Sequence, residues 1–268
     1  MNAPELLAQA SGLSKSRIKD AMHKGAVWQS RGTRKPQRLR RATAPLQPGD
    51  RLALYYDSTI LDRAPIAASL IADHARYSVW HKPAGLLVEG SRYGDHATLL
   101  HQVEAHFQPA RRVWLVHRLD LEAAGLILIA HTPQAAARLS ALFQTRTIDK
   151  QYYIEVQGKL GVSDDRGRYA SSLDAKPAVT DYRVDHYDAA HNLTRVEVTM
   201  LSGRYHQIRR HFEAAGHPVL GDPKYGRGNS HPEGMRLVAV RLGFIDPWQE
   251  KAVTFSIAPE TRLRWGWS

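Results

Sequence analysis

The sequence predicts an α+β protein in which a domain with a mixed, largely antiparallel sheet follows a small basic N-terminal domain. Short strand patterns and helix patterns mix along most of the chain without the regular alternation that produces a parallel sheet. The length of 268 residues exceeds the usual size of one domain, and 43% hydrophobic residues suffice for a core. The first 57 residues differ from the rest in pattern and in charge.

We expect residues 1–57 to form a helical hairpin followed by strands. Leu6 and Leu7 lie in a short helical pattern, Ser14 can cap a second helix, and Gly25 can end it in a left-handed turn. An alternating strand follows the Pro-Gly turn at 48–49. Basic residues cluster just before that strand, and we expect RNA contacts from Arg31, Arg34, Lys35, Arg38, Arg40 and Arg41.

This layout resembles the alpha-L type RNA-binding domain shared with a small-subunit ribosomal protein. The alternative is a disordered basic arm over residues 31–41 attached to an ordinary helical cap. We take residues 58–71 as a linker and 72–268 as the second domain.

The charge balance indicates a polyanionic partner. Lys and Arg number 37 against 26 Asp and Glu, a formal charge of +11. RNA, DNA and anionic membrane all fit, but no apolar run approaches the ~18 residues that span a bilayer. The start lacks the pattern of a secretory signal, so we expect a cytoplasmic protein without a membrane partner. Zero cysteines exclude disulfides, thiolate zinc sites, iron–sulfur clusters and thiol nucleophiles.

Beyond the linker, hydrophobic patterns predict short strands and three helices. The strands are expected at 77–81, 113–116, 126–130, 152–157, 196–200, 236–240 and 253–257. The helices are expected at 97–107, 133–144 and 204–215, the second opening with Pro133 after a Thr at the cap position.

Asp120 is the first candidate for chemistry. It lies between the apolar strand Trp114-Leu115-Val116 and the apolar run at 125–130, with His117 and Arg118 just before it. Its role is either a turn acceptor for backbone N–H groups or a carboxylate kept ionised by a cation in a cleft.

The segment 203–226 offers that cation. On a helix, Tyr205, Ile208, Phe212 and Ala215 form a buried stripe with Arg209 at its edge. Arg209 has two possible partners, the local Glu213 and the distant Asp120. His206 and Arg210 share another face, which is either solvated or in contact with phosphate. The spacing of His206, His211 and His217 does not favour a metal site, and we expect none.

Two shorter segments complete the candidate site. Tyr152 and Tyr153 are adjacent in a strand, so their rings point to opposite faces, and one could face a cleft and stack on an extruded base. Packing is the alternative role for either ring. Lys82-Pro83-Ala84-Gly85 reads as a turn.

Four segments in this order resemble the RluA-type pseudouridine synthase family. They are HKPAGLLV at 81–88, VHRLDLEAAGLILIA at 116–130, KQYYIEVQG at 150–158 and GRYHQIRRHFEAAGHPVLGDPKYG at 203–226. The resemblance covers about residues 72–268 and implies the pseudouridine synthase fold. It also implies an isomerase that extrudes a uridine from structured RNA, cuts its bond to ribose and rejoins the base through carbon 5, with no cofactor.

The resemblance implies roles for individual residues. Asp120 is the catalytic carboxylate, Arg209 pairs with it, and Tyr152 packs against the base and is a candidate late base. Arg118 holds the flipped-out RNA site. We expect further RNA contacts from His117, Lys82, Arg204 and His206. An alpha-L domain favours ribosomal RNA over transfer RNA as the substrate, and we expect a monomer.

The chain departs from the family pattern at two places. Leu121-Glu122-Ala123-Ala124 replaces a loop that usually has a polar or basic residue and then Thr-Ser, and Tyr205 stands where Thr is usual. The altered loop leaves open a catalytically inactive RNA-binding protein of the same fold. A hydrolase with paired carboxylates is the third reading, for which Asp120 has only Glu122 nearby.

Overall fold

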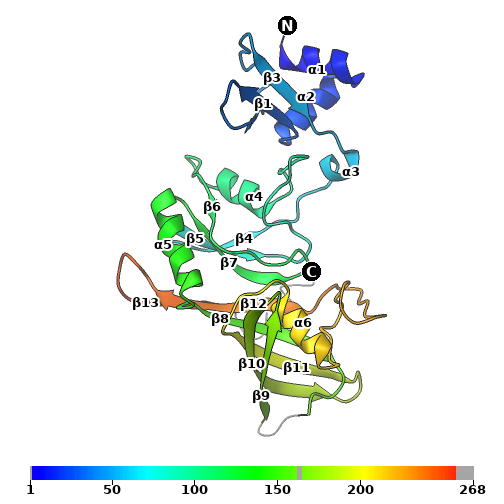
Figure 1. Cartoon of the computed structure of the whole chain (residues 1–268), viewed down its shortest axis with the longest axis vertical. Coiled ribbons are helices and arrows are strands. Elements are labelled where there is room, and N and C mark those ends of the chain that lie inside the picture. Colours follow the sequence, from blue (N-terminus) through cyan, green and yellow to red (C-terminus); the bar gives the residue numbers. More distant parts are fainter. Residues whose placement is uncertain (1, 162–164, 258–268) are drawn as a thin grey trace. The chain divides into compact units, whose positions relative to one another are not determined.

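The computed structural model describes residues 2–161 and 165–257, and the end of the expected 72–268 domain lies outside them (Figure 1). The chain divides into two compact units. One comprises Met1–Ile66 and Leu87–Ala110, and the other Ala67–Leu86 and Arg111–Ser268. The residues expected to form a linker contain helix α3 (Ser58–Leu61) and most of strand β4 (Ser69–Asp73). Among the described residues, no helix is both long and apolar enough to cross a membrane.

The first unit begins with the predicted helical hairpin, α1 (Ala3–Ser11) and α2 (Lys15–His23). Asn2 and Glu5 form a capping box on α1, and Ser14 caps α2 as predicted. An antiparallel sheet follows in the order β2 (Gln37–Arg38), β1 (Val27–Arg31), β3 (Asp50–Leu54). The hydrophobic core of the first unit contains Ala3, Leu7, Ile18, Met22, Val27 and Leu39. Helix α4 (Leu99–His106), capped by Thr98, also belongs to this unit.

The second unit contains a mixed sheet with the order β4-β5-β7-β12-β8-β11-β10-β9 in the described part of the chain. Strands β6 and β13 pair with β7 and β12. Every pairing given for these strands is antiparallel except β7 with β12. The strand bounds are β5 Tyr77–Lys82, β6 Trp114–Leu115, β7 Ala124–Ala130, β8 Asp149–Gln157, β9 Arg166–Leu173, β10 Lys176–Asp188, β11 Leu193–Met200, β12 Leu237–Ile245 and β13 Ala252–Ser256.

Two helices of this unit pack near strands of the sheet. Helix α5 (Pro133–Gln144) begins at the predicted Pro133 after the Thr132 cap, and it packs near β6 and β7. Helix α6 (Gln207–Ala214) packs near β9 and β10. The hydrophobic core gathers on β5, β7 and β12 and includes Leu126, Leu128, Val238, Val240 and Phe244.

Two sequence predictions need correction. The helix predicted over 204–215 begins only at Gln207, because His206 has the left-handed backbone conformation at φ 52°. Tyr205 therefore lies outside the helix and is exposed, rather than part of the buried stripe. The hairpin of β9 and β10 was not predicted, since its residues are largely polar and half exposed.

Strand β7 sets the position of the loop that carries Asp120. All of its residues are buried, as expected for a central strand covered on both faces. Gly125 has φ 116°, and a Cβ atom there would lie 2.3 Å from the carbonyl oxygen of Ala239 in β12. The close approach of β7 and β12 therefore requires glycine at this position.

We predict that Gly125→Ala destabilises the protein by at least ~1–3 kcal/mol, because the added methyl group collides with backbone and the positive φ disfavours alanine. Urea unfolding measures the change. Gly161→Ala is the control, since a Cβ atom there meets nothing within 4 Å. Equal stability of the two variants would contradict the prediction.

Candidate functional site

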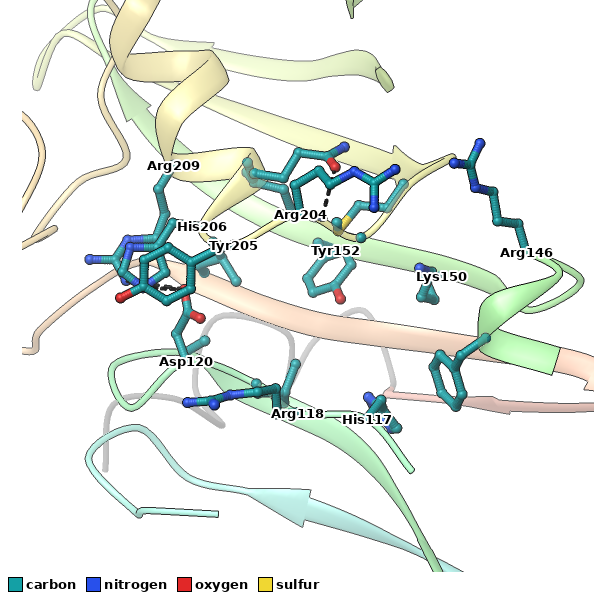
Figure 2. Close-up of a pocket in the computed structure, with 18 of the residues that line it drawn as sticks. His117, Arg118, Asp120, Arg146, Lys150, Tyr152, Arg204, Tyr205, His206 and Arg209 are labelled. Atoms are coloured by element: carbon teal, nitrogen blue, oxygen red, sulfur yellow. Dashed lines mark hydrogen bonds and ion pairs between the residues drawn. The ribbon is translucent and has the colours of Figure 1, made fainter. Parts of the chain in front are cut away.

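The second unit contains a cavity of about 650 Å³ on the side of the sheet where β8 and the start of α6 face the loop before β7 (Figure 2). The residues that line it come from four segments far apart in the chain. They include His117, Arg118, Asp120, Arg146, Lys150, Tyr152, Arg204, Tyr205, His206 and Arg209. The folded chain thus brings together all three residues expected to act on the substrate.

Arg209 is the centre of the charged network in this cavity. Its side chain is 1% exposed. Nε and Nη2 donate to both carboxylate oxygens of Asp222 at 2.6 and 2.8 Å, and Nη1 donates to Asp120 at 3.0 Å. Nη1 also lies 3.2 Å from a Glu122 oxygen. Of the two partners considered for Arg209, the structure places it on Asp120 rather than Glu213.

These pairs determine the charge state of the guanidinium. Burial alone would lower the pKa of Arg209, but the hydrogen bonds and charges of Asp222 and Asp120 raise it above its ordinary value. Arg209 is therefore a permanent cation that Asp120 faces. The Asp120 side chain is 24% exposed, so it stays accessible to a substrate in the cavity while it is paired.

Asp222 is a functional residue that the sequence reasoning missed. Its side chain is fully buried, and besides Arg209 it accepts hydrogen bonds from the backbone N–H groups of Lys224 and Tyr225 at 2.8 and 3.0 Å. It thus fixes Arg209 from the side opposite the cavity and ties α6 to the loop after it. Its place in the GDPKYG run could have indicated it, since that run belongs to the same motif as Arg209.

His206 bridges the carboxylate and the aromatic residues of the site. Its Nε2 lies 3.7 Å from Asp120 and 3.3 Å from Arg209 Nη1, and its Nδ1 lies 3.3 Å from the Tyr225 hydroxyl. Burial lowers the pKa of His206 although Asp120 opposes this, which favours the neutral ring.

The prediction that Tyr152 and Tyr153 face opposite sides of β8 is confirmed. Tyr152 lines the cavity, whereas Tyr153 belongs to the hydrophobic core. Burial, and then the charge on Asp120, raise the pKa of the Tyr152 hydroxyl. The phenol is therefore protonated at neutral pH, and its ring forms a flat wall beside the carboxylate (Figure 2).

Cations line the cavity on several sides. Arg118 and Arg204 were expected there, and Arg146 and Lys150 join them. Arg204 Nε donates to the Pro177 carbonyl at 3.2 Å. The described structure gives Arg118, Arg146 and Lys150 no ion pair. These side chains are available for the phosphates of a nucleic acid.

Two residues expected to contact RNA have other surroundings. Lys82 is fully buried, and its Nζ donates to the carbonyls of Pro83, Leu86 and Leu121 at 3.0, 2.9 and 3.2 Å. Burial lowers the pKa of Lys82 to about 7, against the attraction of Asp120 and Glu122. This position corrects the expectation for Lys82, because a buried ammonium whose donors are used joins the turn at 82–86 to the Asp120 loop instead of reaching a phosphate.

His117 is held within the loop. Its Nε2 accepts a hydrogen bond from the backbone N–H of Leu128 at 2.9 Å, and its ring stacks on Phe143 with centroids 4.3 Å apart. Burial lowers the pKa of His117 to about 3, so the ring is neutral at physiological pH. It lines the cavity as an uncharged group and supplies no cation.

Some basic side chains of the first unit form ion pairs within the protein, and others are exposed. Arg38 and Arg40 both pair with Asp95, at 3.1 and 2.6 Å, and Arg38 also covers the Trp28 ring. Arg31 pairs with Asp50 at 2.7 Å. Asp95 belongs to the 87–110 segment of the same unit, so these ion pairs join that segment to the N-terminal strands. The remaining members of the cluster, Arg34, Lys35 and Arg41, are exposed.

The site as a whole combines a carboxylate paired with a buried arginine, a tyrosine wall and a cationic rim. A carboxylate so placed can act as a nucleophile or a base, and the rim can hold a phosphate backbone. Among the described residues, no group of three or more His, Asp and Glu side chains could hold a metal ion. The carboxylate, the tyrosine and the cationic rim together define a class of protein that acts on a nucleotide of a nucleic acid.

Comparison with known proteins agrees with this class. Residues 76–214 match the family model described as RNA pseudouridylate synthase. An uncharacterized RNA pseudouridine synthase from Aquifex aeolicus is 32% identical over 92% of this chain and 87% of its own length. The ribosomal large subunit pseudouridine synthase D of Nitrosomonas europaea is 38% identical over 56% of this chain and 47% of its own. The chain belongs to the RNA pseudouridine synthase family, isomerases that act on uridine in RNA.

Solved structures agree on the fold. Human RNA pseudouridylate synthase domain containing 1 matches with a TM-score of 0.60 at 24% identity, over 72% of this chain and 83% of that one. Human RNA pseudouridylate synthase domain containing 4 matches with a TM-score of 0.57 at 22% identity, over 73% and 93%. The predicted α+β fold with a mixed, largely antiparallel sheet is thereby confirmed.

We predict that Asp222→Asn lowers the free energy of unfolding by ~3–5 kcal/mol, because it leaves the buried Arg209 without its main counter-charge. Glu122→Gln removes a carboxylate that is 32% exposed from the same guanidinium, and we expect a loss below ~1 kcal/mol. Urea unfolding of both variants checks this, and equal losses would mean that Asp222 has no special part in holding Arg209.

We predict that the triple variant Arg34→Ala, Lys35→Ala, Arg41→Ala binds RNA more weakly and with a smaller salt dependence. The slope of log K against log salt falls by about 0.7–0.9 for each phosphate that the protein no longer neutralises. Arg31→Ala is the comparison, since Asp50 already neutralises Arg31. Filter binding over a salt series measures the slopes, and an unchanged slope in the triple variant would exclude these residues from RNA binding.

Proposed function

We propose that this protein converts uridine to pseudouridine in large-subunit ribosomal RNA, with Asp120 as the catalytic carboxylate. The observation that carries the proposal is the Asp120–Arg209 ion pair at 3.0 Å, which holds an ionised carboxylate in a cavity lined by cations. The names of several relatives support ribosomal RNA. They include ribosomal large subunit pseudouridine synthase D of Neisseria meningitidis and synthase C of Haemophilus influenzae.

The cavity supplies contacts for a nucleotide that has left the base stack. The target nucleotide must leave the base stack, at a cost of a few kcal/mol (roughly) that contacts to the RNA offset. Arg118, Arg204 and Arg146 supply cations for the flanking phosphates, and the Tyr152 ring supplies a surface for the extruded uracil. The base can then turn within the pocket between cleavage and rejoining.

The atoms of the reaction balance without a cofactor. The bond between ribose C1′ and uracil N1 breaks, and a bond between C1′ and C5 forms. C5 loses its proton and N1 gains one, so no redox change or hydrolysis occurs. The Asp120 carboxylate acts either as a nucleophile or as a base toward the 2′ proton, and both roles need it ionised. Arg209 favours that form.

We assign to Tyr152 the late removal of the C5 proton, for which its hydroxyl must first ionise. Burial is the larger cause of the raised pKa of its hydroxyl and the charge on Asp120 the smaller one, and only the smaller one disappears once Asp120 has bonded or taken a proton. The tyrosine thus becomes easier to ionise after the first step, when a base is needed. This order supports a late role for Tyr152.

The altered loop at 121–124 is compatible with activity. Ala123 and Ala124 are buried, so hydroxyl groups at these positions would each need a partner inside the protein. The loop still places Asp120 on Arg209. We therefore favour an active enzyme over an inactive RNA-binding protein of the same fold. Ribosomal RNA as the substrate implies a cytoplasmic enzyme, and we propose that it acts as a monomer.

We predict that Asp120→Asn abolishes turnover while RNA affinity persists, because an amide is neither an anionic nucleophile nor a base and the lost charge would only have repelled phosphate. The measurement is a single-turnover assay on unmodified large-subunit ribosomal RNA beside a filter-binding titration. Pseudouridine formed by a well-folded Asp120→Asn variant would disprove the assignment.

We predict that Tyr152→Phe keeps RNA affinity, since the ring remains, and slows turnover by roughly 10²–10⁴-fold, the usual contribution of a general base. Tyr153→Phe is the matched control on the opposite face of β8. Both variants are tested in the same single-turnover assay. Normal turnover by Tyr152→Phe would limit Tyr152 to packing against the base.

A further inference from the structure

Tyr205 is an exposed aromatic residue at the mouth of the cavity. It lines the same cavity as Asp120 and yet 59% of its surface is accessible to solvent. Its side chain contributes nothing to the hydrophobic core of the unit. An exposed ring beside a nucleotide pocket is a surface on which a base can stack, because every base has a flat π face.

The surrounding residues hold the Tyr205 ring in place. Because His206 has a left-handed backbone, helix α6 begins only at Gln207, and Tyr205 lies outside the helix. The His206 ring stacks on the Tyr205 ring with centroids 3.7 Å apart and an angle of 22°, and Lys224 Nζ lies 5.5 Å from the centre of the Tyr205 ring. The ring is thus held in one position before RNA binds. Stacking a base on it therefore costs little additional conformational entropy of the side chain.

The position of Tyr205 favours a neighbour of the target base over the target itself. Tyr152, which is only partly exposed, already supplies the wall beside Asp120 (Figure 2). Tyr205 belongs to the exposed part of the cavity lining, and Lys224 beside its ring can contact a phosphate next to a base stacked there.

We infer that Tyr205 stacks on a nucleotide base next to the target uridine and so helps to select the RNA site. The inference rests on the proposed function, since it assumes that the target base enters the cavity of Asp120. Tyr205 acts in binding and selection and takes no part in the bond changes. Its loss therefore affects the concentration of RNA that is needed, and not the rate of the bound complex.

Photo-crosslinking locates the contact without any turnover. Unmodified large-subunit ribosomal RNA transcribed with 5-iodouridine crosslinks to stacked aromatic side chains under long-wavelength light, and mass spectrometry identifies the residue. We expect a crosslink at Tyr205 in the wild type and at the same position in Tyr205→Phe. If both proteins crosslink at other residues and neither crosslinks at position 205, the inference is overturned. A wild type that crosslinks at 205 but forms no pseudouridine in the same RNA transcribed without iodine instead refutes the proposed function alone.

Single-turnover kinetics on the same RNA without iodine separate selection from structure. We expect Tyr205→Ala to raise the half-saturating RNA concentration by about tenfold, within the range known for base–aromatic stacking, at an unchanged maximal rate. Tyr205→Phe should resemble the wild type, and Tyr205→Leu should resemble Tyr205→Ala. The matched control is Tyr187→Ala, another tyrosine with a lysine near its ring, Lys159 at 5.6 Å, which lies outside the cavity.

An abasic nucleotide at each position flanking the modified uridine completes the test. At one position the abasic change should weaken the wild type about tenfold and leave Tyr205→Ala without further loss, because the stacking partner is already gone. The inference would be overturned if, at every flanking position, the abasic change weakened Tyr205→Ala as much as it weakens the wild type. It would also be overturned if Tyr205→Leu behaved like Tyr205→Phe.

Discussion

The buried guanidinium of Arg209 is the interaction on which the site depends. Asp222 holds it from inside the protein through two hydrogen bonds, and Asp120 meets it from the cavity. A buried cation is costly unless it is paired, so the fold must bring a carboxylate to each side of it. The same pairing fixes the direction of the Asp120 carboxylate. Stability and chemistry are thus joined in one side chain.

The sheet supplies the geometry that this pairing requires. Asp120 lies on the loop before β7, Arg209 lies on α6, and Tyr152 lies on β8. The parallel contact of β7 with β12 is possible only because Gly125 has no side chain. This contact fixes the loop of Asp120 relative to the elements that carry Arg209 and Tyr152. Lys82 adds a second constraint, because its ammonium binds the Leu121 carbonyl next to Asp120. The residues that follow Asp120 are therefore held at Leu121 and at Gly125, while the carboxylate stays accessible.

Much of this could be predicted from local sequence. The Ser14 cap, the Pro133 start of α5 and the opposite faces of Tyr152 and Tyr153 follow from short-range rules. Lys82 and Asp222 could not be placed in this way, since burial and partners depend on segments distant in the chain. The exposure of Tyr205 was also missed, because one residue with a left-handed backbone, His206, shortened the predicted helix. The β9–β10 hairpin gave no signal since its strands are mostly polar.

The most direct test of the central claim is a map of pseudouridines in ribosomal RNA from cells that lack this protein. The account predicts that at least one pseudouridine of the large-subunit RNA disappears. It should return when the wild-type protein is supplied and stay absent when Asp120→Asn is supplied at equal abundance. An unchanged map in the deletion strain, or full restoration by Asp120→Asn, would contradict the account.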